Sequence, residues 1–128
     1  TGNTRYGIQN LCFEHSTGMW LVAVYTGQKP QFGNYPMFLI DGSKKPQWKK
    51  LQGRDEEGLV LQLAPVGTQD QMGVWGLDFK YGSTGIEAVG DGTVWFSHHM
   101  KNESDHTFAC NMVLYKFYEG NFEKCLDK

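Results

Sequence analysis

The chain has 128 residues, with 12 Lys and Arg against 14 Asp and Glu, so its formal net charge at neutral pH is −2. This length is typical of one domain that buries roughly two-thirds of its unfolded surface without metals or many disulfides. The near balance of charge gives no general polyanion-binding signature, and an aromatic content of 14% is too high for a disordered chain. The longest apolar run, Met19–Tyr25, is too short to span a membrane as a helix.

Short apolar or alternating runs fill the first half of the chain, and helical periodicity is nearly absent. Four segments there are predicted as strands: Tyr6–Glu14, Met19–Tyr25, Tyr35–Ile40 and Gln47–Gln52. The turn His15–Gly18 joins the first two as a hairpin. Because Met19–Tyr25 is apolar on both faces, we expect that strand to be buried on both sides.

The second half continues in the same pattern. Five more strands are predicted: Leu59–Leu63, Trp75–Tyr81, Ile86–Val89, Thr93–His98 and Phe108–Tyr118. The third and fourth of these flank Gly90–Gly92, which is a tight-turn signal. The tail, Gly120–Lys128, is the one segment where a helical turn is expected.

These nine or ten short strands predict an all-β fold over residues 1–128. Their regular spacing and Gly-rich turns are typical of a single-domain antiparallel β-sandwich, and we expect a jelly-roll-like one. A β-trefoil is the alternative, because Leu11–Leu21 has the strand, turn and strand of a trefoil unit. Its nearest analogues begin at Leu59 and Ile86, so the offsets are unequal and the sandwich ranks first.

Three cysteines and one sequon bear on the compartment. Cys12, Cys110 and Cys125 have no CxxC spacing, and a disulfide between Cys110 and Cys125 would close a short loop that stabilises by up to ~3 kcal/mol. Three reduced, buried thiols are the alternative. Asn102-Glu103-Ser104 is a candidate glycosylation site. Together with a start at Thr1 that carries neither Met nor a signal-like segment, these features favour a secreted or surface protein.

Catalytic and metal signatures are incomplete. Cys12 and His15 are close enough in sequence to be considered as a catalytic dyad, but Cys12 lies in an apolar run typical of the core. Paired carboxylates for glycoside cleavage would have to converge from separate predicted strands, and the candidates are Glu14, Asp78 and Glu87. No phosphate-binding glycine motif is present, so no nucleotide cofactor is expected. The histidines of the segment His98–His106 match no strong zinc spacing, so no metal is expected either.

Four lysines surround Trp48 in the segment Lys44–Lys50. Such a cluster would suit a sulfated glycan or single-stranded nucleic acid. The acidic run Asp55–Glu57 follows and partly neutralises it. We therefore favour an edge strand whose lysines block pairing with other chains, and expect no specific nucleic-acid partner.

Aromatic residues give the strongest functional indication. Trp20 and Trp75 lie in apolar patterns and are predicted core residues, whereas Trp48 and Trp95 have more polar neighbours and are predicted to be exposed. An exposed ring stacks on the C–H face of a sugar while short polar side chains bind its hydroxyls. The candidate ligand-binding residues are therefore Trp95, His98, His99, Asn102, Asp105 and Trp48, with burial of Trp95 at a sheet edge as the alternative.

The leading hypothesis is a non-catalytic recognition module that binds a glycan or glycoprotein, in the manner of a lectin or adhesin. The first alternative is a protein-binding module of an adhesion or signalling complex, which would use an exposed edge strand and aromatic hot spots. The second is a small hydrolase. A flat apolar patch would favour the protein partner, and a small concave polar site with an exposed aromatic ring would favour the sugar.

Overall fold

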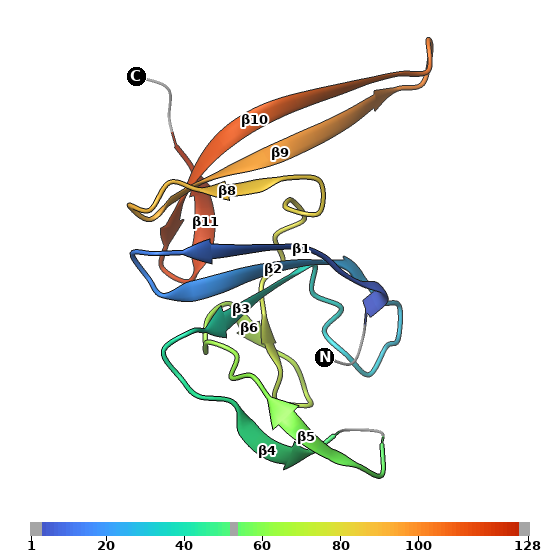
Figure 1. Cartoon of the computed structure of the whole chain (residues 1–128). Helices are drawn as coiled ribbons and strands as arrows, with labels where there is room; N and C mark the ends of the chain where they lie inside the picture. Colours follow the sequence, from blue (N-terminus) through green and yellow to red (C-terminus); the bar gives the residue numbers. More distant parts are fainter. Residues whose placement is uncertain (1–3, 52–53, 126–128) are drawn as a thin grey trace.

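The computed structural model describes residues 4–51 and 54–125, which form eleven antiparallel strands and no helix (Figure 1). The all-β prediction is confirmed. None of the described residues form a helix that could span a membrane.

The first sheet has the strand order β1-β2-β3 and lies at the middle of the molecule (Figure 1). Its strands are β1 (Thr4–Glu14), β2 (Met19–Thr26) and β3 (Met37–Asp41). The predicted hairpin is confirmed, because Glu14 pairs with Met19 across the four-residue turn. β2 is the central strand and is buried from Leu21 to Val24, as its two apolar faces predict.

The second sheet has the order β11-β10-β9-β8. Its strands are β8 (Ile86–Ala88), β9 (Thr93–Asn102), β10 (Thr107–Tyr118) and β11 (Asn121–Lys124). The helical turn expected in the tail is wrong. Glu119 and Gly120 both adopt positive φ, 48° and 80°, and this tight turn sends the chain back as β11. Residues 126–128 of that predicted tail lie outside the described residues.

Two small two-stranded sheets complete the fold: β4 (Gln47–Lys50) with β5 (Glu57–Val60), and β6 (Thr68–Gln69) with β7 (Trp75–Gly76). The strand predicted over Trp75–Tyr81 is thus only two residues long. After it, Leu77 makes a single bridge to Met37, and Leu77 and Phe79 go on into the core. The predicted strand Gln47–Gln52 ends at Lys50, and its residue Gln52 lies outside the described residues.

The main core lies between the two larger sheets. The first sheet contributes Leu21, Ala23, Met37 and Leu39, and the second contributes Val94, Phe96, Tyr115 and Phe122. A second cluster, Val22, Val24, Tyr35 and Phe38, covers the opposite face of the first sheet. This alternation along β2 places one face in each cluster. The arrangement of packed antiparallel sheets is consistent with the predicted β-sandwich.

One part of the second sheet extends away from this core. β9 and β10 continue as a two-stranded ribbon well past β8 and β11, and their tip projects far from the first sheet, at the upper right of Figure 1. Residues 99–112, here called the arm, are all exposed. The ladder between the strands runs without a register shift from the Lys116–Thr93 pair to the Thr107–Asn102 pair.

Candidate functional site

The predicted sugar-binding rim is spread along the β9–β10 ribbon and over both of its faces. Trp95 lies at the base, half-exposed on the face opposite the main core, with Glu87 and Leu114 as its cross-strand neighbours. Asn102 lies seven residues further on, about 23 Å away at the rise of an extended strand. A ligand the size of one sugar ring does not reach from Trp95 to the tip.

His98 lies on the other face of the ribbon and is held by aromatic neighbours. Its ring stacks on Tyr81 with centroids 3.6 Å apart, and its Nε2 shares a 2.8 Å hydrogen bond with the Tyr115 hydroxyl. Burial, followed by the charges of Lys124 and Lys80, lowers the pKa of His98. His98 is therefore a half-buried neutral group that ties β9 to its neighbours, and it faces away from Trp95.

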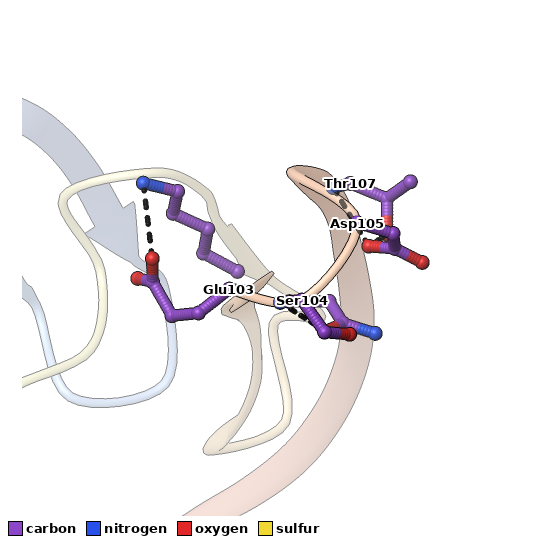
Figure 2. A network of polar contacts seen from close by, with 6 residues as sticks. Glu103, Ser104, Asp105 and Thr107 are labelled. Atoms are coloured by element: carbon purple, nitrogen blue, oxygen red, sulfur yellow. Dashed lines mark hydrogen bonds and ion pairs between the residues drawn. The ribbon is translucent and has the colours of Figure 1, made fainter.

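His99, Asn102 and Asp105 lie on the arm. The His99 ring stacks on Phe108 at 5.3 Å. At the tip, the Asn102 side chain accepts hydrogen bonds from the amide and hydroxyl of Ser104, and Asp105 accepts the same pair from Thr107 (Figure 2). Their acceptor oxygens therefore shape the turn, and the amide nitrogen of the Asn102 sequon side chain lies on an exposed tip.

Trp48 is 70% exposed on β4, as predicted, but lies in a different sheet from the other rim residues. Three of the surrounding cations have acidic partners. Lys50 pairs with Asp55 at 3.5 Å, Arg54 with Glu56 at 2.8 Å, and Lys44 with Asp41 at 3.9 Å. This pairing fits the interpretation of β4 as a solvated, charge-protected strand.

Two expectations about individual residues are wrong. Trp20 was predicted in the core but is 39% exposed, because it packs on the outside of the first sheet against Phe13. The Cys110–Cys125 disulfide is absent, and all three cysteines, which the structure describes, are free. Cys125 lies beside Leu114, where its amide donates to the Leu114 carbonyl, so Cys110 is four strand residues, about 13 Å, away.

The carboxylate of Glu14 is buried, and hydrogen bonds from the hairpin turn account for its burial. It accepts from the amides and hydroxyls of Ser16 and Thr17 and from the amide of Gly92 on the β8–β9 turn. Burial alone would raise its pKa, but these hydrogen bonds outweigh burial and leave the pKa below the ordinary value of 4.5. Glu14 thus joins two turns of the fold, and the Cys12–His15 dyad has no support, since the His15 ring packs on Phe13.

A concave site lies elsewhere, at the end of β2. A hollow of about 430 Å³ is lined by Tyr25, Asn34, Asp78, Lys80 and Ser83, with Val24, Thr26 and Pro36 completing its wall. The volume falls within the range of small-ligand sites. Three separate segments form it: the end of β2, the loop before β3 and the chain between β7 and β8.

Strand alternation places the Tyr25 ring here. Leu21 and Ala23 point into the main core, so Tyr25, two residues further, lies on the same face just beyond the core. The chain after β7 crosses this face, and Gly82 sits so close to Ala23 and Met37 that an added Cβ would lie about 3 Å from them. This close approach brings Ser83 and Lys80 beside the strand end, where Tyr25 remains 44% exposed.

Two polar side chains of the hollow, Asp78 and Ser83, retain hydrogen-bonding capacity. Within the described residues, neither the Asp78 carboxylate nor the Ser83 hydroxyl has a hydrogen-bond or ion-pair partner. Lys80 lies over the ring of Tyr81, with its Nζ 5.2 Å from the ring centroid. The amide of Val24 donates to the Pro36 carbonyl, which fixes the Asn34 loop against the strand. The hollow therefore offers an aromatic ring beside both an acceptor and donors.

The sequence pattern concealed this site. Tyr25 is the last residue of an apolar strand, and Asp78 is one polar residue in an alternating run, so neither stands out by spacing. One sequence signal was present, the Gly33-Asn34 pair in the loop before β3. Such a pair is typical of a turn, and Asn34 indeed adopts a positive φ of 53°.

Neither a search for metal sites nor comparison with known proteins indicates a function for the chain. In the part of the chain that the structure describes, no group of three or more His, Cys, Asp or Glu side chains lies close enough to hold a metal ion. Comparisons with protein-family models, with curated proteins and with solved structures found no match.

Proposed function

We propose that the protein is a carbohydrate-binding module and that the hollow at the end of β2 receives one ring of a neutral saccharide. The observation that carries this proposal is the presence, in one concavity, of the exposed Tyr25 ring and the Asp78 carboxylate, which has no hydrogen-bond or ion-pair partner among the described residues. The site differs from the rim predicted around Trp95, although the chemistry is the same.

Each group has a defined role in this proposal. The Tyr25 ring stacks on the C–H face of the sugar and excludes water from it. The two oxygens of Asp78 accept hydrogen bonds from neighbouring hydroxyls, and such charge-assisted bonds are stronger than neutral ones. Lys80 donates to a ring or hydroxyl oxygen, and Ser83 can either donate or accept.

Neutral sugars fit this site better than acidic ones. Asp78 repels an anion, and the ammonium of Lys80 is shared with the Tyr81 ring. The hollow is shallow and open, so binding to a single ring is expected to be weak. Secretion or surface display remains a prediction, which now depends on the exposed Asn102 sequon because the disulfide is absent.

A glycan array tests the proposal, followed by affinity measurements on any hit. Tyr25→Ala and Asp78→Asn should each weaken binding by about tenfold or more, since each removes an interaction of order 1–2 kcal/mol. Tyr25→Phe should retain most of the affinity because it keeps the stacking ring.

Matched controls separate the site from the general surface. Tyr118→Ala removes a tyrosine at the end of β10 that is slightly more exposed than Tyr25, and Asp55→Asn neutralises a fully exposed aspartate. Both should leave affinity unchanged. Binding that survives Tyr25→Ala and Asp78→Asn, or an array without any specific signal, would contradict the proposal.

A further inference from the structure

None of the described strands pairs with the outer edge of β10 along the arm. β11 covers β10 only from Tyr115 to Tyr118, and the last contact on this edge is the 2.8 Å hydrogen bond from the Cys125 amide to the Leu114 carbonyl. Among the described residues, no strand pairs with the outer side of β10 between Thr107 and Val113. This segment is called the free edge.

The free edge lacks the features by which proteins prevent edge pairing. The run from Thr107 to Leu114 contains no charged residue and no proline, and its ladder with β9 has no bulge. Long, flat and uncharged edges of this kind add a further strand readily. The outer edge of β9 is different, because it is open only from His98 to Asn102 and carries Lys101.

The direction of the backbone groups can be assigned. Because the Leu114 carbonyl points outward to Cys125, alternation turns the amides and carbonyls of Met112, Cys110 and Phe108 outward as well. The side chains of these three residues lie on one face of the ribbon and are all exposed. The free edge therefore combines outward hydrogen-bonding groups with a row of exposed Phe, Cys and Met side chains, while His99 and Lys101 of β9 lie across from Cys110 and Phe108 on the same face.

We infer that this edge pairs with the same edge of a second copy of the chain. Antiparallel strands related by a twofold axis are self-complementary, and an uncharged edge brings no repulsion between identical copies. The register that uses the whole free edge is centred on Cys110. It places Cys110 opposite the Cys110 of the second copy, and Phe108 opposite Met112 on both sides of the axis.

This pairing would join two ribbons into one four-stranded sheet. Each facing pair of outward residues exchanges two backbone hydrogen bonds, and the aromatic–methionine pairs cover the exposed face. The dimer would carry two hollows, one on each copy, so a surface bearing many sugars would be bound with avidity. The pairing itself does not depend on the proposed sugar site.

Sedimentation in the absence of sugar tests the inference through a charge exchange. The wild-type chain should dimerise with rising concentration. The variants F108K/M112K and F108E/M112E should each remain folded and sediment as monomers. Their dimer dissociation constants should exceed that of the wild-type chain by about 100-fold or more, because like charges face each other at both pairs. Mixing the two variants should restore a dimer, since the register pairs Lys with Glu.

Two further samples complete the test. The control L59K/L61K charges two exposed leucines in and just after β5 and should still dimerise. A short thiol–thiol cross-linker should trap wild-type dimers but not Cys110→Ser, which should still dimerise by sedimentation. A wild-type chain that stays monomeric, or variants that dimerise alone as well as when mixed, would overturn the inference and leave the edge to a different occupant.

Discussion

The base and the arm of the β9–β10 ribbon share one ladder and have opposite surroundings. At the base, Val94 and Phe96 are completely buried, whereas Phe108 and Met112 on the arm are more than half exposed. The strand pairing is equally regular in both halves. The comparison shows that local strand pairing and the turn at the tip are enough to form the ribbon. Whether its side chains are buried depends on how far β8, β11 and the first sheet extend along it.

Removing one phenylalanine from each half gives the largest expected contrast. Phe96→Ala should lower the free energy of unfolding by about 3–5 kcal/mol, because it leaves a cavity beside Phe79 and Phe122, whose rings lie 4.7 and 5.1 Å away. At concentrations where the chain is monomeric, Phe108→Ala should lower the free energy of unfolding by less than about 1 kcal/mol. Urea unfolding of the monomer measures both, and equal losses would mean that the arm packs against another part of its own chain.

Glu14 tests what attaches the ribbon base to the first hairpin. Glu14→Gln should cost about 2 kcal/mol, because an amide nitrogen cannot accept the hydrogen bonds of Ser16, Thr17 and Gly92. Glu87→Gln, on the exposed side of β8, should have little effect. Urea unfolding of both variants at neutral pH is the measurement, and equal stabilities would show that the Glu14 network contributes nothing.

The same carboxylate also predicts an acid dependence. Its pKa is lower in the folded state than the ordinary 4.5, so the unfolded chain binds more protons between these two values. The stability from Glu14 is therefore fully present above pH 4.5 and is lost as the pH falls through the folded-state pKa. In Glu14→Gln this part of the acid transition should vanish, and an unchanged pH profile would refute the assignment.

The smallest expected effect on stability comes from His98, which lies at the boundary between the base and the arm. Its pKa is lowered mainly by burial, so the folded state favours the neutral ring and the unfolded chain binds more protons just below pH 6.5. Stability should decline as the pH falls through 6.5 and below. His98→Gln should flatten this decline, as measured by melting temperature across that range.

The sequence predicts most of the strands but little of the site. Alternation and turn residues identified the hairpin around Glu14–Met19 and the burial of both β2 faces, because these depend on local chemistry. The exposure of Trp20 depends on which sheet covers which face, and the separation of Trp95 from Asn102 depends on β9 continuing to Asn102, past the predicted end at His98. The hollow escaped prediction because Tyr25 and Asp78 meet only through the tertiary fold.

An NMR titration with a saccharide identified on the array would test the central proposal most directly. Sugar binding in the hollow should shift the amide signals of residues 24–26, 34 and 78–83 and leave those of the arm, residues 99–112, unchanged. Shifts centred on Trp95 and the arm would contradict the proposed site and return the ligand to the β9–β10 ribbon.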